Sequence, residues 1–480
     1  MNKVCLVTPP SDFLLDQRVF PNLGILKVGA VLERAGVQVD HLDLTGVANY
    51  EEVACDYPEE ATFALTATTP QIPAAVKVRD VIREAHPNSR IILGGPHATL
   101  IHSAAKRGIA RAQRALEYLV RTFDSVVAGD GEKAIFVALE RDGIVDADDP
   151  KSLLWQSSQD FTENPWPARH LLDLESYQYS IEGARALHLI SQLGCPMACN
   201  FCSGRNSPML RRIRLRPPEN VIAEVTYLHD TYGCSAYNFF DDELNVNRLM
   251  LELMRQMKRA ADERGVEWKL RGFIKAELFT EEQAEAMYAA GFRWILIGFE
   301  SGSDRILLNI NKKATRDENS RALEIAHAHG IKVKALMSLG HAGESESTVD
   351  ETHDWLLDSH PDDVDVTVIT PYPGSPYWDD AVHVVGDAWC YTAPKTSDRL
   401  YMDDVDFVHE ADYYKGAPGA YVSHVWTDHL DRHNLVALRD KLEDKARKAL
   451  GIPYPTAAAA LNFEHSMGQR LPEYILRGSK

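Results

Sequence analysis

The chain has 480 residues, of which 45% are hydrophobic and 25% are charged, and its formal net charge is −19. This length exceeds one ordinary hydrophobic core, so two or three domains are expected. The acidic balance makes nucleic acid an unexpected partner, and no apolar run reaches the roughly 18–20 residues of a membrane span, which argues against a membrane protein.

Residues 1–145 alternate short apolar strands with helical segments, which predicts a parallel, doubly wound α/β sheet. The expected strands are Val4–Thr8, Val39–Leu44, Phe63–Thr68, Ile91–Leu93 and Ser125–Ala128. Ligands of such sheets bind at the carboxyl ends of the strands. Two of these ends carry glycines, in the runs GGPH at 94–97 and GDGE at 129–132. A dinucleotide is disfavoured because no GxGxxG follows the first strand.

The rest of the chain divides into a linker and two further parts. Residues 146–185 contain prolines without a steady period and are interpreted as a linker. Strands and helices alternate again over 186–380 on a longer repeat, and six βα units predict a partial barrel. Residues 381–480 include one charged amphipathic helix over Leu435–Leu450. We expect this last part to form a small α+β cap that shapes a substrate pocket.

Three cysteines follow the first strand of the barrel region. Cys195, Cys199 and Cys202 have CxxxCxxC spacing within LGCPMACNFCS. Three thiolates can ligate three irons of a [4Fe–4S] cubane and leave the fourth iron open. Gly194 and Pro196 favour a loop over a helix face with three buried cysteines.

The cysteine count also bears on zinc binding and on disulfide bonds. A structural zinc would need a fourth ligand from elsewhere, and Cys234 is the nearest spare thiol. Seven cysteines, an odd number with three clustered, do not resemble a disulfide framework. Free thiols and iron–sulfur chemistry both suit a reducing cytoplasm, which is therefore the expected location.

An arginine-rich segment comes directly after the cysteines. Its members are Arg205, Arg211, Arg212, Arg214 and Arg216. They are interpreted either as ion-pair partners within an acidic protein or as a site that recognises a carboxylate or phosphate.

The cysteine loop is similar to the signature of the radical S-adenosylmethionine (SAM) superfamily. Downstream strand ends resemble the same family: FFDDE, IGFESGS, LMSLGHAGE and TPYPGSPYW. Residues in front resemble the cobalamin (B12)-binding domain found before many of its members, through VTPP, NLGILKVGAVLERAG, ALTATTP, IILGGPHAT and VVAGDGEKA. The resemblance implies an N-terminal Rossmann-like, flavodoxin-like cobalamin-binding domain, a partial (β/α)6 TIM barrel and the C-terminal cap.

The resemblance implies three cofactors, namely a [4Fe–4S] cluster, SAM and cobalamin. The cluster would be ligated by the three cysteines. SAM would contact Phe201, Asp241, Asp242, Arg271, Glu300, Ser301 and Ser338. Cobalamin would contact Thr66, Thr68, Thr69, Gln71, Gly94, Gly95, Pro96, His97, Gly129, Gly131 and Glu132. The DxHxxG stretch of other cobalamin proteins is absent between Pro10 and Gly24, so cobalt would lack that histidine ligand.

The activity implied by the resemblance is methylation of an unactivated carbon, or of phosphorus, in a small-molecule substrate. A 5′-deoxyadenosyl radical and methylcobalamin would carry the reaction, and a protein such as a flavodoxin or ferredoxin would supply electrons. Three alternatives stay open. They are a radical rearrangement, cyclisation or oxidation without methyl transfer, a first domain without cobalamin, and a non-catalytic iron–sulfur or zinc scaffold.

Overall fold

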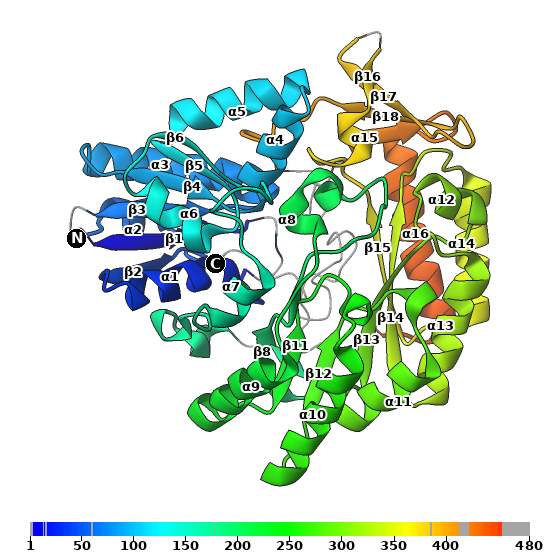
Figure 1. Ribbon diagram of the computed structural model, residues 1–480. Helices are drawn as coiled ribbons and strands as arrows, with labels where there is room; N and C mark the ends of the chain where they lie inside the picture. The colour runs from blue at the N-terminus through cyan, green and yellow to red at the C-terminus, as the bar shows by residue number, and fades with distance from the viewer. Residues whose placement is uncertain are drawn as a thin grey trace.

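The structure is a computed structural model that describes residues 3–12, 14, 17–58, 61–177, 179–384, 386–411 and 422–453. Within these residues an α/β domain is followed by a second, barrel-like α/β domain and a small C-terminal α+β part (Figure 1). None of the described helices is long and apolar enough to cross a membrane.

The first domain is built on a six-stranded parallel sheet in the order β2-β1-β3-β4-β5-β6. Its strands are β1 (Val4–Thr8), β2 (Val39–Asp43), β3 (Thr62–Thr66), β4 (Ile91–Gly94), β5 (Ser125–Gly129) and β6 (Gly143–Ala147). Strands β1, β3 and β5 are wholly buried, as continuous apolar runs predict for a sheet covered on both faces. The order of the first five strands is flavodoxin-like, as expected.

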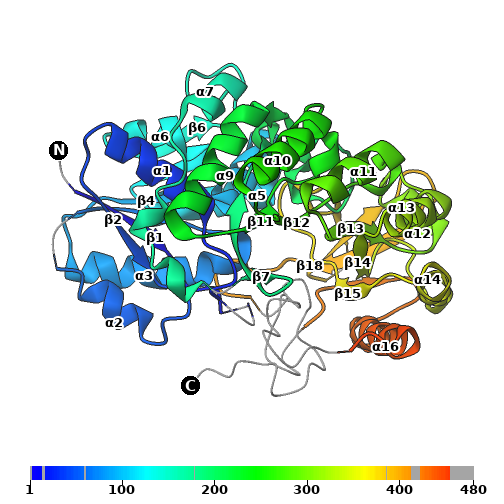
Figure 2. The same ribbon diagram turned by 90° about the horizontal axis from the view of Figure 1, so that it is seen from below.

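Helices cover both faces of this sheet through two separate apolar clusters (Figure 2). One face carries α1 (Leu23–Arg34) and α6 (Gly131–Ala138). The other carries α2 (Tyr50–Cys55), α3 (Ile72–Ala85), α4 (Pro96–Lys106) and α5 (Ala110–Thr122). Two features differ from the sequence expectation, because α4 begins directly at Pro96 and the turn-rich stretch after 142 forms β6. An edge strand tolerates the polar residues of β6 because one side of it has no neighbouring strand.

Six parallel strands form the partial barrel of the second domain, as the sequence predicts. They are β8 (Ala184–Leu189), β11 (Ala236–Phe239), β12 (Lys269–Gly272), β13 (Trp294–Glu300), β14 (Lys332–Leu339) and β15 (Asp363–Val368). Parallel bridges Leu270–Phe292 and Phe273–Leu296 join the β8-β11-β12 half to the β13-β14-β15 half. The outside is covered by α9 (Pro218–Tyr232), α10 (Met250–Arg264), α11 (Glu281–Ala290), α13 (Arg316–Ala328) and α14 (Glu346–Ser359) (Figure 1).

The described C-terminal part is α+β, as expected. Four antiparallel strands, β16 (Val382–His383), β17 (Ala388–Thr392), β18 (Arg399–Asp403) and β19 (Val425–Thr427), form a small sheet. Helix α16 (Arg432–Leu450) packs along β15 and covers the last strand of the barrel (Figure 2). It begins three residues before the expected start, where Asp431 accepts a hydrogen bond from the Asn434 amide. Residues 454–480 of the predicted cap lie outside the described residues.

The linker is fastened to the barrel by a buried ion-pair network. Arg169 of the linker and Arg216 each donate to the carboxylate of Glu224 on α9, at 2.7 and 2.6 Å. All three side chains are at most 5% exposed. Burial would raise the pKa of Glu224, but the two guanidinium groups hold it below its usual value.

We expect Glu224→Gln to lower the free energy of unfolding by about 3 kcal/mol, because removing one partner leaves buried, uncompensated charge. A carboxyl group with a lowered pKa stabilises the fold above its unfolded-state pKa, and this contribution is lost as pH falls through the folded-state pKa. The difference between wild type and variant should therefore shrink below about pH 4. Thermal unfolding across pH measures it, with Glu219→Gln on the exposed first turn of α9 as the control. Equal melting temperatures at neutral pH would contradict the prediction.

Candidate functional site

The three cysteines lie in the loop between β9 (Gln192–Leu193) and the 3-10 helix η4 (Ser203–Asn206). Cys199 is buried, Cys195 is partly buried and Cys202 is exposed. Gly194 adopts a φ of +86°, and a Cβ atom there would lie 2.2 Å from the carbonyl oxygen of Arg212. Only glycine therefore allows the loop to pass this close to the arginine-rich segment.

Hydrogen bonds hold the cysteine loop from two sides. They are Arg211 Nη2 to Pro196 O (2.8 Å), Asn311 Nδ2 to Ala198 O (2.8 Å), Asn200 N to Ile310 O (2.8 Å) and Asn200 Nδ2 to Asn309 O (2.9 Å). The loop is therefore held by contacts from both the arginine-rich segment and the end of α12 (Asp304–Asn309) with the residues that follow it.

The chemistry of the thiols fits an iron–sulfur cluster. Burial raises the pKa of Cys195 to about 11 and also raises that of Cys199. Such thiols give up their protons only when a cation compensates the charge, which is what iron does. Among the described residues no group of three or more His, Cys, Asp or Glu side chains gathers around a single ion position. In a cubane each thiolate binds a different iron, so the three thiols need not converge on one ion position.

A cavity of about 450 Å³ opens beside the cysteine loop at the carboxyl ends of the barrel strands. Barrel enzymes hold their substrates at this end. The polar and aromatic groups that line it include Phe201, Cys202, Glu243, Glu300, Lys312 and Ser338.

An ion pair between Glu300 and Lys312 forms one wall of this cavity. Lys312 Nζ lies 3.0 Å from Glu300 Oε1, and Ser338 Oγ donates to Glu300 Oε2 at 2.8 Å. Burial would raise the pKa of Glu300, but the Lys312 charge and these hydrogen bonds lower it. Glu300 has a φ of +68°, and the register of β13 against β14 shifts between Gly298 and Glu300. This bulge turns the carboxylate into the cavity, as bulges often do next to functional sites.

The polar wall continues from Ser338 to the C-terminal part of the barrel. Ser338 Oγ lies 2.8 Å from His341 Nε2, and His341 Nδ1 lies 3.2 Å from the hydroxyl of Tyr377. Burial lowers the pKa of His341 to about 4, so the ring is neutral and has one donor and one acceptor nitrogen. The ring of Phe201 meets His341 edge-on at 5.5 Å.

The structure brings some of the expected SAM contacts into the cavity and places others elsewhere. Phe201, Glu300 and Ser338 line it. Asp242 is exposed, near the amide of Gly194.

Three expected contacts are not among the residues that line this cavity and have hydrogen-bond partners elsewhere. The carboxylate of Asp241 accepts hydrogen bonds from the Ser191 and Gln192 amides at 2.7 and 3.1 Å. Arg271 donates to the hydroxyl of Tyr179, and Ser301 contacts Thr352 at 3.1 Å.

Two cavity residues were not expected from the sequence. Glu243 lines the cavity as the third acid of the DDE run, so its position in that run was the available signal. Burial raises the pKa of Glu243 to about 7, although Lys312 and Lys275 oppose this. Lys312 belongs to no motif. It lies between two residues with positive φ, Asn311 at +55° and Lys313 at +73°.

The expected cobalamin contacts after β3 and β4 lie together at one edge of the first sheet. Thr66 and Gly94 are register partners, and a Cβ atom on Gly95 would lie 2.7 Å from Thr66 Oγ1. Pro96 begins α4. The remaining contacts are paired with one another: Thr68 N donates to Gln71 Oε1 (3.0 Å), and Thr69 Oγ1 lies 3.1 Å from His97 Nδ1.

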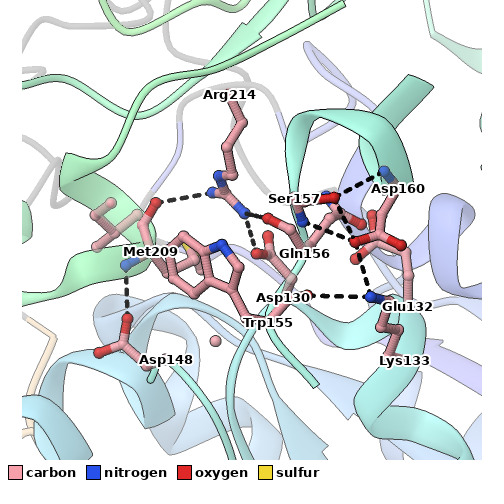
Figure 3. Close-up of polar contacts among 12 residues, drawn as sticks. Asp130, Glu132, Lys133, Asp148, Trp155, Gln156, Ser157, Asp160, Met209 and Arg214 are labelled. Atoms are coloured by element: carbon pink, nitrogen blue, oxygen red, sulfur yellow. Dashed lines mark hydrogen bonds and ion pairs between the residues drawn. The ribbon is translucent and has the colours of Figure 1, made fainter. Parts of the chain in front are cut away.

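The end of β5 meets the arginine-rich segment directly (Figure 3). Asp130 forms an ion pair with Arg214, whose Nη2 also donates to the carbonyl of Met209 at 2.8 Å. Next to it, Glu132 pairs with Lys27 at 2.8 Å. A Cβ atom on Gly129, which has a φ of +99°, would lie 2.4 Å from the backbone of Ala147.

The glycines after β4 and β5 carry no side chain, so a large ligand can approach the backbone of this edge closely, and Glu132 is paired with Lys27. Such an edge suits a corrinoid. Within the arginine-rich segment, Arg214 and Arg216 form ion pairs with carboxylates of this protein, and Arg211 donates a hydrogen bond to the cysteine loop.

Comparison with known families identifies two parts of the chain. Residues 17–137 match the model of the B12 binding domain, and residues 189–356 match that of the radical SAM superfamily. The chain is a radical SAM protein with an N-terminal B12-binding domain. It is thereby a cobalamin-dependent radical SAM enzyme whose cofactors are a [4Fe–4S] cluster, SAM and cobalamin. The family, fold class and cofactors predicted from the sequence are confirmed.

Relatives of this radical SAM enzyme are distant in sequence. An uncharacterised methyltransferase of Pyrococcus horikoshii is 26% identical over 400 residues, covering 79% of this chain and 83% of the relative. An anaerobic magnesium-protoporphyrin IX monomethyl ester cyclase of Cereibacter sphaeroides is 25% identical, covering 74% of this chain and 60% of the relative. The solved radical SAM methyltransferase TsrM of Kitasatospora setae, at 17% identity, has a similar fold with a TM-score of 0.64, covering 86% of this chain and 82% of that one.

The close approach of Gly129, at the end of β5, to the backbone of Ala147 can be tested by substitution. We expect Gly129→Ala to destabilise the first domain by about 3 kcal/mol, because the left-handed backbone and the contact with Ala147 act together. Gly36→Ala is the matched control, since Gly36 also has a positive φ but nothing within 4 Å of its Cβ position. The control should cost only about 1 kcal/mol. Equal losses in thermal unfolding would show that the close approach at Gly129 is unimportant.

Proposed function

We propose that this enzyme methylates an unactivated carbon, or phosphorus, of a small-molecule substrate. The observation that carries the proposal is the contact between the first domain, beside its corrinoid edge, and the segment that directly follows the cysteine loop of the barrel. Asp130 pairs with Arg214, and Ser207 donates to Asp148 at 2.8 Å. Both cofactor-binding edges therefore border the same region of the molecule. The methyltransferase names of the Pyrococcus relative and of TsrM support the proposal.

In this proposal the chain holds each cofactor with a separate set of residues. Cys195, Cys199 and Cys202 bind the cluster. Glu243 and Glu300 receive the ammonium group and ribose hydroxyls of SAM, because an ammonium needs charged acceptors and hydroxyls need lone pairs. The corrinoid lies against the edge formed by Thr66, Thr68, Thr69, Gln71, Gly94, Gly95, Pro96, His97, Gly129, Gly131 and Glu132.

When bound, the reduced cluster and SAM supply a 5′-deoxyadenosyl radical, and the corrinoid supplies the methyl group. The chain itself positions these groups and keeps water away. Phe201, Phe273, Val368 and Ile369 give the cavity an apolar wall beside its charged one. Such a wall limits quenching of reactive species by solvent. The Lys312 ion pair fixes the direction of the Glu300 carboxylate during turnover.

A second candidate is a radical cyclisation or oxidation without methyl transfer. It is favoured by the relative from Cereibacter sphaeroides, which is named as a cyclase and matches 74% of this chain. The two candidates share the cluster, SAM and cavity residues and differ in the fate of the methyl group.

Product analysis after anaerobic reconstitution separates the candidates. We expect S-adenosylhomocysteine and 5′-deoxyadenosine together, because methyl transfer consumes one SAM for the methyl group and a second for the radical. Cys199→Ala should yield neither product. 5′-Deoxyadenosine without S-adenosylhomocysteine would contradict methyl transfer and support the cyclising or oxidising candidate.

A further inference from the structure

A buried ion pair between Lys275 and Glu277 lies near the cysteine loop and outside the cavity wall. Lys275 Nζ lies 2.8 Å from Glu277 Oε1, and the two side chains are 1% and 11% exposed. Lys275 follows the carboxyl end of β12. Its amide donates to Asn245 Oδ1 at 2.8 Å, and its carbonyl accepts from Asn245 Nδ2 at 2.9 Å. The backbone of Lys275 is therefore fixed at the end of the barrel that carries the cavity.

The ammonium group of Lys275 contacts the segment that holds the cysteine loop. Lys275 Nζ donates to the carbonyl oxygen of Lys312 at 3.1 Å. Asn311, the preceding residue, donates through its side chain to the carbonyl of Ala198 at 2.8 Å. Ala198 directly precedes Cys199. Lys275 and the cysteine loop thus contact neighbouring residues of one segment.

The charge of Lys275 acts on the most buried of the three thiols. Burial raises the pKa of Cys199, and the charges of Lys312 and Lys275 are the largest effects that oppose this rise. Two cavity carboxylates act in the other direction with smaller effects, and Glu277 is not among the charges that shift this pKa. The ion pair therefore presents its positive end to the cysteine loop.

We propose that Lys275 raises the reduction potential of the cluster held by Cys195, Cys199 and Cys202. The reduced cluster carries one more negative charge than the oxidised cluster, and a nearby buried cation stabilises that charge. Water screens the interaction little because the lysine is buried. Glu277 holds the ammonium group in place and cancels only part of its field, since it lies on the far side of the pair. The inference applies to methyl transfer and to cyclisation alike, because both need a reduced cluster.

Two other roles fit this ion pair less well. A contact with SAM or substrate would have to reach the cavity, but neither Lys275 nor Glu277 is among the residues that line it. A purely structural role needs no charge, because apolar side chains often replace a buried ion pair without loss of stability. Setting a potential, by contrast, requires both the charge and its direction toward the thiol.

The test measures the midpoint potential of the cluster in the full-length, reconstituted enzyme without SAM. Titanium(III) citrate supplies one electron per cluster and becomes Ti(IV), and electron paramagnetic resonance follows the reduced fraction. Lys275→Gln removes the charge but keeps a hydrogen-bond donor for the Lys312 carbonyl. We expect its equilibrium constant for reduction to fall by about tenfold, or about 59 mV for a one-electron couple. Lys275→Arg, which keeps the charge, should stay within about twofold of wild type.

The two members of the ion pair should shift the potential in opposite directions. Glu277→Gln leaves the cation without its counter-charge, so the equilibrium constant for reduction should rise by about threefold. The matched control is Lys269→Gln at the start of β12, where Lys269 lies 3.1 Å from Glu267 in a pair of the same kind. The control should stay within about twofold of wild type, because its charge is far from the cysteine loop.

An unchanged or higher potential in Lys275→Gln would overturn the proposal. So would shifts of the same sign in Lys275→Gln and Glu277→Gln, a loss in Lys275→Arg as large as that in Lys275→Gln, or an equal loss in the Lys269→Gln control. If Lys275→Gln holds no cluster, Glu277→Gln decides, and a potential that does not rise there overturns the proposal. None of these outcomes depends on the products of turnover, which test the proposed function separately.

Discussion

The site depends on burying thiols in a loop whose shape the protein itself enforces. Arg211 and the stretch Asn309–Asn311 bind the loop carbonyls and amides, and Gly194 lets it pass against Arg212. Burial raises the pKa of Cys195 to about 11, so these groups resist ionisation until a cation arrives. Contacts on both sides thus hold the loop, and iron binding would release the protons of its thiols.

The segment that follows this loop joins the two α/β units. Each unit presents the carboxyl ends of parallel strands, the edge at which such folds bind ligands. The arginine-rich segment that follows the cysteines turns back to Asp130 at the end of β5 (Figure 3), and Arg216 continues into the buried network around Glu224. One stretch of chain thus fixes the corrinoid edge, the cluster loop and the linker relative to one another.

The sequence was most informative where spacing and periodicity carry the signal. Apolar runs located most of the strands, and the CxxxCxxC spacing located the loop. The sequence pattern alone does not show which of several neighbouring acids faces the cavity. In the DDE run the Asp241 carboxylate accepts hydrogen bonds from the Ser191 and Gln192 amides, while Glu243 lines the cavity. Which acid turns inward depends on how the chain leaves β11, and residue type does not encode that.

Local backbone geometry explains the other differences. Glu300 enters the cavity through a bulge with a positive φ, so the adjacent Ser301 points to Thr352 instead. Lys312 reaches Glu300 because Asn311 and Lys313 on either side adopt left-handed conformations. Non-glycine residues adopt this conformation rarely, and no sequence motif predicts it here. These strained positions gather at the cavity, where the surrounding contacts hold them in place.

Electron paramagnetic resonance of the reduced, reconstituted enzyme detects the cluster itself. We expect the signal of one reduced [4Fe–4S] cluster per chain, and we expect its shape to change when SAM is added because an open iron beside the Glu300 cavity accepts it. A protein without that signal, or with a cluster signal that saturating SAM leaves unchanged, would rule out an open iron at the three cysteines.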